Sequence, residues 1–521
     1  MSDLLSRRIT ALLDADAAST LAGIRRGIEK ESLRITESGR LAQSDHPAAL
    51  GSALTHPHIT TDYSEALLEL ITPAYDELSA PLDFLDQLHR FVYSKIGDEI
   101  LWVNSMPCAI ADEMEVRIAE YGSSNTGRMK NIYRQGLWHR YGRKMQAIAG
   151  IHYNFSYPAE FWALHQQQEQ DEQPLQDFIS SRYFDLLRNF QRYSWLLIYL
   201  FGASPALCAS FLSGQKHQLL QNNDGTLFRP FSTSLRMSDL GYQNNVQSSL
   251  NVSLNNLTEY VRSLNYAIHT PEASYENIGL KRDGEYLQLN TNILQIENEF
   301  YSSIRPKRTT EPGERPTKAL QQRGVEYIEI RVMDLNPFEP VGIGLNDMRF
   351  LDLFATYCLL CESPDMDIFD GHGAKQNIRQ VVYSGRNTLT RLCRNGRQTS
   401  LKTWGLEIID RLMPIAELFD RCHGGKNYRD TLSRQYEKLQ HPELTPSARV
   451  MEKLETRQQS FFAFAMNQAL AHRDHFRARP LDTDTLASLD RIAADSLREQ
   501  KALEDSPQIP FEQYLANYFA D

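Results

Sequence analysis

Two glutamates of this chain stand where a strand would be expected to face a core. Glu29 and Glu31 lie two residues apart in the stretch 27–35, which has the pattern of a strand. On a strand such side chains share a face and lie roughly 6.6 Å apart. At an effective dielectric constant of about 20 their repulsion is about 2.5 kcal/mol. A solvated strand face explains the pair taken alone, whereas a buried face requires cations that offset the repulsion.

Other stretches repeat this pattern of a charged or polar group on an apolar strand. Glu69 interrupts an apolar strand expected at 67–71, and Asp62 lies just before that strand. His152 lies on the polar face of an alternating strand at 148–156. A hydrogen-bonded structural role would explain His152 taken alone. Whether it is a ligand therefore depends on what the other strands carry.

The clearest alternation in the chain is at 326–332, where Glu329 and Arg331 share the polar face. A plain ion pair would explain these two residues. The repetition over several strands instead indicates one sheet with a face lined by ligands for hard cations such as Mg²⁺. Several magnesium ions suggest a triphosphate. The chain has neither a Walker A motif nor a Rossmann fingerprint, so metals and arginines are expected to hold the phosphates.

Composition and charge argue against several classes of protein. The chain has 521 residues and a formal net charge of -11, which argues against binding to a nucleic-acid backbone. The N-terminus has no pattern of a secretory signal, so we expect a cytoplasmic protein. The uncharged segment 195–212 contains Gly202 and Pro205 and is expected to be a buried helix that turns into a second element, not a membrane span.

Alternating strands predict an antiparallel sheet with helices around it, the α+β class. A second strand-rich block is expected from Tyr286 to Arg308, and helices from about Ser400 onward, with Thr445 and either Asp482 or Asp484 as N-caps. No long linker separates independent domains. We therefore expect one catalytic unit over 1–521, with a sheet-bearing core at 21–350 and a mainly helical part at 351–521 packed on it.

The six cysteines are sparse and have no pattern of a disulfide framework, which favours reduced thiols. Cys358 and Cys361 form a C-x-x-C, but they lie in an apolar helical pattern without a second pair of ligands. They are expected to be buried thiols and not a zinc or redox site.

Several stretches, in order along nearly the whole chain, closely resemble the proteobacterial type of glutamate-cysteine ligase, also called gamma-glutamylcysteine synthetase. The resemblance is strongest before about Leu351. The stretches are Arg26–Glu31, Gly51–His56, Ile59–Asp62, Tyr121–Gly127, Gly150–Phe155, Ser234–Tyr242, Ile304–Arg308 and Glu326–Arg331.

The resemblance implies a fold similar to glutamine synthetase, in which a curved antiparallel sheet forms a funnel surrounded by helices. It implies ligation of the gamma-carboxylate of L-glutamate to the amine of L-cysteine, through a gamma-glutamyl phosphate, as the first step of glutathione biosynthesis. ATP is the expected co-substrate and Mg²⁺ the expected cofactor, with more than one ion and Mn²⁺ as an alternative. Partners are then small molecules only, with no nucleic acid or membrane, and a monomer is expected.

Positions that match the family's motifs receive roles by resemblance. The expected magnesium-binding residues are Glu29, Glu31, Asp62, Glu69, His152 and Glu329. Catalysis is assigned to Arg331, near the transferred phosphoryl group, together with Glu29 and Glu329. Substrate binding is assigned to Arg236, Tyr133, Tyr242, Tyr63, Leu137, Gln146 and Ile148.

Two alternatives stay open at this point. One is a related ATP-dependent gamma-glutamyl ligase that uses another amine as acceptor. The other is a non-catalytic protein that senses magnesium or nucleotide.

Overall fold

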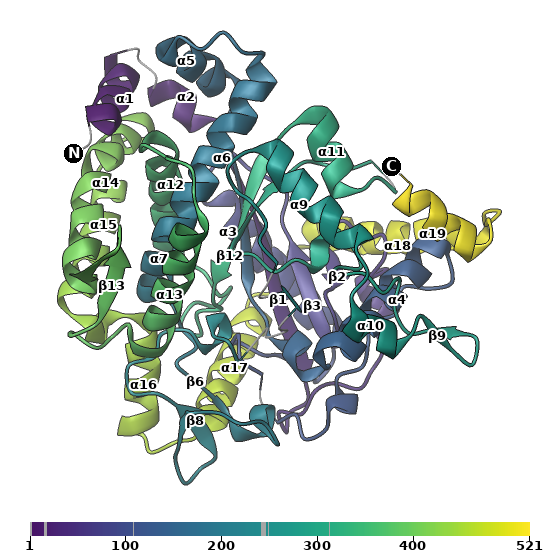
Figure 1. The fold of residues 1–521 in the computed structure, drawn as a ribbon. Coiled ribbons are helices and arrows are strands. Elements are labelled where there is room, and N and C mark those ends of the chain that lie inside the picture. The colour runs from purple at the N-terminus through teal and green to yellow at the C-terminus, as the bar shows by residue number, and fades with distance from the viewer. Residues whose placement is uncertain are drawn as a thin grey trace.

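A seven-stranded antiparallel sheet carries the predicted acidic face and lies at the centre of the computed structural model (Figure 1). The structure describes residues 3–14, 18–107, 109–240, 246–247, 250–311 and 313–520. Along the sheet the strands are β11 (Ile304–Lys307), β12 (Tyr327–Met333), β5 (Ile151–Ser156), β1 (Arg25–Ile35), β3 (Leu67–Ile71) and β2 (Ile59–Thr61), with β4 (Ile100–Leu101) paired to the end of β1. The prediction of an α+β fold with an antiparallel sheet is confirmed.

The strand register brings the predicted residues onto one face. Glu29 on β1 lies opposite His152 on β5, and Glu31 lies opposite Glu69 on β3. Glu329 on β12 lies opposite Asn154 on β5. Residues that are opposite each other in an antiparallel pair point to the same side of the sheet. Four strands therefore supply one polar face, which we call the front face.

An irregularity interrupts the pairing of β12 with β5 next to this face. Ile330 pairs with Tyr153, but the next pair along the strands joins Met333 to Ile151. A bulge of this kind bends a strand and changes the direction of a side chain. It falls at Arg331, whose backbone N–H donates to Ser303 O at 2.9 Å.

The rear face of β1 carries buried charged residues among its apolar ones. Arg26, Lys30 and Arg34 are all buried there. Arg26 and Asp352 form an ion pair at 2.9 Å in which both side chains are 0% exposed. A buried ion pair needs further hydrogen bonds to offset its desolvation. Tyr153 OH supplies one, since it donates to Asp352 Oδ1 at 2.9 Å.

Helices cover the rear of the sheet and extend from it as a layer (Figure 1). In this layer α6 (Leu175–Tyr193), α12 (Leu345–Leu360), α14 (Leu401–His423) and α15 (Asn427–Gln440) pack together, with α1 (Asp3–Asp14) and α2 (Ala18–Ala22) against α14. The remaining helices of the first 400 residues are α3 (Ala80–Lys95), α4 (Asn125–Tyr141), α5 (Ala159–Glu169), α7 (Trp195–Phe201), α9 (Leu257–His269), α10 (Ala273–Ile278), α11 (Pro316–Arg323) and α13 (Ile368–Ser384).

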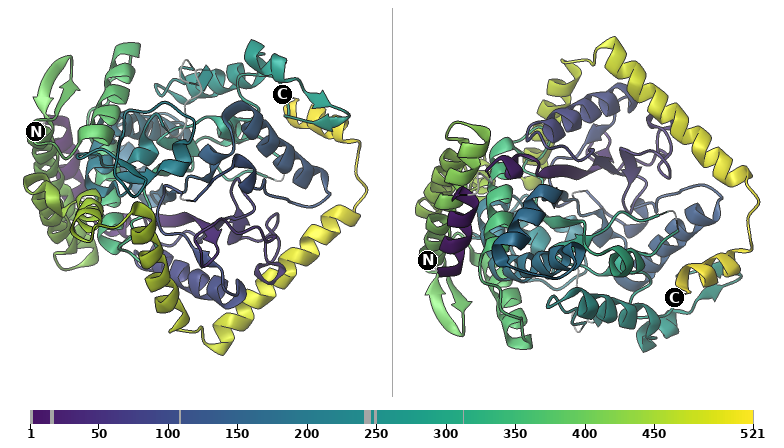
Figure 2. Two further views of the ribbon diagram at one scale, coloured as in Figure 1. Left: turned by 90° about the horizontal axis from the view of Figure 1, so that it is seen from below. Right: turned by 90° about the horizontal axis from the view of Figure 1, so that it is seen from above.

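The last helices leave this layer and return to the sheet half of the molecule. They are α16 (Pro446–Thr456), α17 (Phe461–Arg477), α18 (Thr483–Asp505) and α19 (Phe511–Phe519). Figure 2 shows α18 running along the outside of the molecule, and α19 then contacts α4. The predicted caps are confirmed, because Thr445 accepts from Ala448 N and Asp482 accepts from Asp484 N and Thr485 N.

Three small sheets complete the described strands: β6 (Ala206–Cys208) with β8 (Thr226–Phe228) and β7 (Leu220–Gln221), β9 (Lys281–Arg282) with β10 (Glu285–Tyr286), and β13 (Arg391–Arg394) with β14 (Arg397–Ser400). The segment 195–212 contains the buried helix α7 followed by β6, as predicted. Within the part of the chain that the structure describes, no helix combines the length and the apolar character needed to span a membrane.

Two expectations are wrong. The strand-rich block is irregular from 287 to 303, because polar side chains there bind the local backbone and compete with a strand ladder. Gln295 Oε1 accepts from Leu289 N, and Asn290 Nδ2 donates to Gln295 O. Cys208 is disulfide-bonded, which the sequence does not reveal because pairing depends on tertiary proximity. Cys358 and Cys361 are free and buried, as expected.

Candidate functional site

His152 lies at the centre of two overlapping groups of ligands on the front face. Glu29, His152 and Glu329 form one group, and Glu31, Glu69 and His152 form the other. In each group the ligand atoms lie within 4.8 Å of one another. Five of the six predicted magnesium-binding residues thus come together from β1, β3, β5 and β12. Asp62 belongs to neither group but lines an adjoining pocket with Glu31.

The two ring nitrogens of His152 face different carboxylates. Nδ1 lies 3.1 Å from Glu29 Oε2 and 3.9 Å from Glu329 Oε1. Nε2 lies 3.6 Å from Glu31 Oε1. Because the strand places the ring between β1 and β12, one histidine can serve both groups.

Protein groups hold the carboxylates in place. Asn154 Nδ2 donates to Glu29 Oε1 at 2.9 Å, and Gly150 N donates to Glu31 Oε2 at 2.6 Å. Gly150 has no room for a Cβ, because the guanidinium of Arg236 packs directly against it. The front face is therefore preorganised before any cation binds.

The two groups differ in their protonation. Burial raises the pKa of Glu69 well above its usual value, and the neighbouring carboxylates of Glu29, Asp62 and Glu31 add to the effect. Burial and the charge of Asp62 also raise the pKa of Glu31. A cation that binds beside Glu31 and Glu69 must therefore compete with protons.

Glu29 and Glu329 show the opposite shift. Burial would raise the pKa of Glu29, but the hydrogen bond with His152 and the charges of His152 and Lys307 together outweigh burial and lower the pKa. Burial likewise opposes the ionisation of Glu329, yet the charges of Lys307 and Arg331 hold its pKa well below the usual range. This group is anionic at neutral pH and already has basic residues beside it.

Arg331 is a cationic residue that contacts two of the candidate ligands directly. Its Nη1 lies 3.1 Å from Glu329 Oε2 and 3.4 Å from His152 Nδ1. Its buried Nε has no hydrogen-bond partner among the described residues. Since an unpaired buried donor is costly, this nitrogen is suited to an oxygen of a bound ligand.

A pocket of about 120 Å³ adjoins the ligand groups, and we call it the tyrosine pocket. Of the residues predicted for substrate binding, it is lined by Tyr63, Tyr133, Leu137 and Gln146, together with Glu31, Asp62 and Arg331. Ile148 and Arg236 are buried but do not line it. Arg236 instead donates from Nη2 to Arg331 O at 3.0 Å. Tyr242 lies outside the described residues.

The tyrosine pocket also has lining residues that the sequence analysis missed: Arg134, Tyr141, Gln247, Asn298, Glu299, Tyr301 and Arg305. Arg305 had a usable signal, because it lies in a stretch that carries the family resemblance and is opposite Glu329 on the sheet. Tyr141 also had one, because it follows the predicted residues Tyr133 and Leu137 at helical spacing on α4. Arg134 lies off that face of the helix, and the others come from irregular segments.

A second cavity of about 310 Å³ lies on the other side of Arg305. Arg305, Lys307 and Arg308 line it together with Tyr260 and Tyr327. Lys307 Nζ is 3.4 Å from Glu329 Oε1, so one residue that lines this basic cavity also contacts the ligand groups. A larger cavity of about 540 Å³ lies between α6, α13, β13 and α14 and contains none of the predicted site residues.

The donor set fits a divalent cation. Carboxylate oxygens and one imidazole are ligands that Mg²⁺ and Mn²⁺ accept. Asn154 Oδ1 is buried at the same face without a hydrogen-bond partner among the described residues, and can accept from a metal-bound water. A sheet face with these candidate ligands, flanked by basic residues and two cavities, is the arrangement expected of a metal-dependent enzyme that acts on anionic substrates.

The chain belongs to the glutamate-cysteine ligase family, because the family model of that description matches residues 9–381. It is 66% identical to the glutamate-cysteine ligase of Alcanivorax borkumensis over 99% of each chain. It is 50% identical to that of Pseudomonas entomophila over 100% of this chain and 98% of the other.

Solved structures agree with this assignment. The glutamate-cysteine ligase of Francisella tularensis in complex with AMP superposes with a TM-score of 0.90 at 38% identity, over 95% of this chain and 97% of that one. A bifunctional glutathione synthetase from Pasteurella multocida superposes with a TM-score of 0.73 at 24% identity, over 93% of this chain and 58% of that one. The second match supports the fold alone.

Proposed function

We propose that this chain ligates the gamma-carboxylate of L-glutamate to the amine of L-cysteine at the expense of ATP, giving gamma-glutamylcysteine, ADP and phosphate. This would be the first step of glutathione biosynthesis. The observation that carries the proposal is the pair of ligand groups that share His152 beside the unpaired Nε of Arg331. Membership of the glutamate-cysteine ligase family supports it.

Glu29, Glu31, Glu69, His152 and Glu329 would hold more than one Mg²⁺, with Asp62 at the edge of the site. When bound, the ions would neutralise phosphate charge and polarise the phosphoryl group. The residues themselves keep the site rigid, since Gly150 N and Asn154 Nδ2 orient two of the carboxylates.

A carboxylate is a poor acylating agent, so the glutamate would first accept the gamma-phosphoryl group of ATP. The amine of cysteine would then attack the resulting gamma-glutamyl phosphate, and phosphate would leave. Both steps move negative charge without a protein nucleophile. Arg331 would stabilise that charge with a guanidinium already held in position, an effect commonly worth about 3 kcal/mol.

The basic cavity is our candidate for the nucleotide. Arg305, Lys307 and Arg308 offer cations for phosphates, and Tyr260 and Tyr327 offer aromatic surface for a base. The similar Francisella tularensis enzyme was solved with AMP, which supports nucleotide binding in this fold.

The tyrosine pocket is our candidate for the second amino acid. Tyr63 OH and Gln146 Nε2 are buried and have no hydrogen-bond partner among the described residues, so both are available to a ligand. Tyr133 and Leu137 would contribute apolar contacts. The binding roles of Ile148, Arg236 and Tyr242 stay predictions, because the first two lie outside the pocket lining and Tyr242 lies outside the described residues.

We also propose that the chain acts in the cytoplasm as one catalytic unit and as a monomer. The packing of α17 and α19 back onto α3 and α4 supports one catalytic unit. Light scattering should give a mass near 59.8 kDa, the mass of one chain. A dimer mass would contradict the monomer.

The function is tested by incubating the purified chain with ATP, Mg²⁺, glutamate and cysteine and measuring ADP release and product mass. We expect rapid ADP release only when glutamate and cysteine are both present, with the mass of gamma-glutamylcysteine. Reactions without glutamate, and with other amines in place of cysteine, are the controls. A product from another amine alone would favour a related ligase, and absence of ADP release under all conditions would favour a sensor.

A further inference from the structure

The cavity of about 540 Å³ in the helical layer lies away from the front face, and we call it the helical cavity. α6, α13, α14 and the hairpin of β13 and β14 supply its lining, together with the connection from α12 to α13. None of its described lining residues also lines the tyrosine pocket or the basic cavity. Its volume is in the range of about 300–1,000 Å³ that is usual for small-molecule sites.

Arg411 on α14 brings a positive charge to the helical cavity, and no carboxylate of the described residues pairs with it. Its Nη1 donates to Tyr357 OH at 3.1 Å, and the titratable groups that act on its charge are Tyr357, Cys361 and Tyr193. Burial raises the pKa of all three, to about 11 for Cys361 and to about 12 for Tyr193. They are therefore neutral at neutral pH, and the charge of Arg411 is available to an anion.

Two more arginines line the helical cavity, and both already have partners. Arg192 on α6 lies 3.9 Å from Asp370 and also donates to backbone carbonyls of the connection from α12 to α13. Arg394 on β13 pairs with Glu407 at 2.5 Å. These two side chains are therefore held in position, and they add positive charge beside Arg411 without being free themselves.

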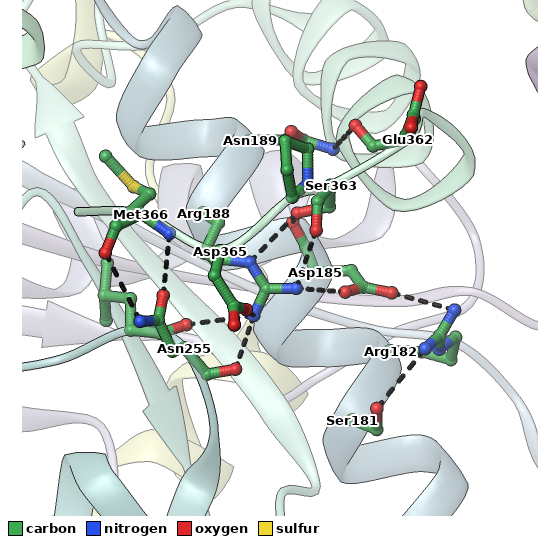
Figure 3. Close-up of polar contacts among 12 residues, drawn as sticks. Ser181, Arg182, Asp185, Arg188, Asn189, Asn255, Glu362, Ser363, Asp365 and Met366 are labelled. Carbon is green, nitrogen blue, oxygen red and sulfur yellow. Dashed lines mark hydrogen bonds and ion pairs between the residues drawn. The ribbon is translucent and has the colours of Figure 1, made fainter. Parts of the chain in front are cut away.

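The acidic residues near the cavity limit the charge of a ligand. Asp185 on α6 pairs with Arg188 and does not line the cavity (Figure 3). Glu362 and Asp370 do line it, and both are exposed. A highly charged anion would be repelled by these two carboxylates, whereas a single anionic group can pair with Arg411.

Hydrogen bonds between distant segments fix the walls of the helical cavity. Asn377 on α13 donates to Cys393 O and accepts from Cys393 N, both at 2.7 Å, which joins α13 to β13. Asn189 on α6 donates to Cys358 O at 2.8 Å and to Glu362 O at 3.3 Å, which joins α6 to the end of α12 (Figure 3). The cavity is therefore formed before a ligand binds, which lowers the entropic cost of binding.

Aromatic surface lies beside these charges. Tyr193 and Trp404 line the cavity with ring centroids 6.3 Å apart. Phe369 on α13 also lines it, although its side chain is 85% exposed. Contact with an apolar group would remove part of this ring from water, which is favourable. The lining thus offers one unpaired cation next to aromatic side chains.

We propose that the helical cavity is a second binding site, separate from the candidate active site, for a small organic molecule with one carboxylate or phosphate group and an apolar body. Arg411 pairs with the anionic group. Tyr193 and Phe369 contact the apolar body. The proposed function uses none of these residues, so the inference does not depend on it.

Calorimetry on the full chain without Mg²⁺ tests the site with two pairs of probes, benzoate with acetate and phenyl phosphate with inorganic phosphate. Within a pair the anionic group is the same and only one probe has an apolar body. In at least one pair we expect the aromatic probe to have a Kd about tenfold or more lower than its partner, and that pair identifies the preferred anionic group. Equal affinities within both pairs would indicate an adventitious ion only and would overturn the inference.

Gly373→Phe locates the bound probe by filling the cavity without replacing Arg411. Gly373 on α13 lines the cavity, and a Cβ built there meets open space. Gly371→Phe is the matched control, because Gly371 lies on the same helix and is equally open but does not line the cavity. We expect the Kd to rise about tenfold or more in Gly373→Phe and less than about twofold in Gly371→Phe. The same Kd in both variants would contradict the site.

Arg411→Gln tests the charge directly. Loss of a charged hydrogen bond should raise the Kd about tenfold or more, and Arg411→Lys should recover part of the affinity, with Tm as the measure of folding. Arg331→Ala should bind the probe like the wild type, because Arg331 lies on the front face. Unchanged binding in Arg411→Gln, or loss of binding in Arg331→Ala, would show that the probe binds elsewhere and would overturn the inference.

Discussion

At the scale of single residues, the front face carries two kinds of carboxylate, which differ in pKa. Glu29 and Glu329 are ionised with basic partners, whereas the pKa values of Glu31 and Glu69 are raised, first by burial and then by neighbouring carboxylates. Their sequence patterns do not distinguish them, since each is an acidic residue on a predicted strand. Neighbours from other strands cause the difference.

Glu29→Gln should weaken cation binding with little change in the shape of the side chain. The amide keeps the size of the side chain but loses the charge that faces His152 and the cation. We expect the Mg²⁺ concentration for half-maximal activity to rise about tenfold or more, with a large fall in kcat. Titration of activity with Mg²⁺ measures both, with the exposed Glu160→Gln as control. A normal Mg²⁺ dependence would exclude Glu29 as a ligand.

Arg331→Ala should affect turnover more than nucleotide binding. The guanidinium is expected to act on charge that develops during phosphoryl transfer, so kcat should fall about 100-fold or more. The Kd of ATP, measured by calorimetry, should change by less than about tenfold. Arg331→Lys retains the charge and should recover part of kcat. If Arg331→Ala has the kcat of the wild type, its assigned role is wrong.

At the scale of elements, β1 shows how the two faces of one strand can both be charged. Its front carries Glu29 and Glu31, and its rear carries Arg26, Lys30 and Arg34. The rear cations have partners from distant elements: Arg26 pairs with Asp352, Arg34 pairs with Glu99, and Lys30 Nζ donates to His89 Nε2 at 2.8 Å. The alternation of the strand was readable from the sequence, but the partners that make the burial tolerable were not.

Helix α5 provides a test of pH dependence away from the site. His165 is buried between Phe161 and Phe178, and neither ring nitrogen has a hydrogen-bond partner among the described residues. Burial, with a smaller contribution from the charge of Arg8, lowers its pKa from 6.5 to about 4. The unfolded chain therefore binds more protons than the folded chain between these two values, and stability falls as the pH falls through that range.

In His165→Phe this contribution should disappear. When the pH is lowered from 7.5 to 5, the free energy of unfolding should fall by about 2 kcal/mol more in the wild type than in the variant. Urea denaturation of both proteins at the two pH values measures this change, and other buried histidines cancel because both proteins contain them. A difference in unfolding free energy that is independent of pH would contradict the assignment.

At the scale of the whole molecule, the C-terminal helices connect the helical layer to the substrate side of the sheet (Figure 2). α19 packs on α4, which supplies Tyr133 and Leu137 to the tyrosine pocket. The contact is a small separate cluster, formed by Met129, Ile132, Leu289, Phe511 and Leu515. Its size suggests that α19 can detach without unfolding the rest.

Phe511→Ala should release α19. Removal of a buried phenylalanine costs about 3–5 kcal/mol, and the ring also lies 4.4 Å from the guanidinium of Arg128. We expect limited proteolysis at 506–510 to become about tenfold faster or more, while the Tm of the main transition changes little. The exposed Leu503→Ala on α18 is the control. Equal proteolysis of both variants would show that this cluster does not hold the helix.

Much of the site was predictable because it depends on local alternation. A period of two places Glu29 and Glu31 on one face of β1, and His152 and Glu329 on the polar faces of β5 and β12; the strand register then brings these faces together. The same reasoning failed at 287–303, where Gln295 and Asn290 bind the backbone and prevent a strand. Strand propensity alone does not show whether side-chain hydrogen bonds to the backbone will replace the backbone hydrogen bonds between strands.

By itself, then, the sequence determined the class of fold and the acidic strand faces and predicted a hard divalent cation, since these follow from residue types and short-range periodicity. Only the tertiary structure decided that His152 is shared by two ligand groups, that a bulge lies at Arg331, and that Gln247 and Tyr301 reach the tyrosine pocket. The physical reason is that these features depend on strand order and on contacts between residues far apart in the chain. Glu29 and Glu31 join the two candidate ligand groups through such contacts, with β3, β5 and β12 as their neighbours.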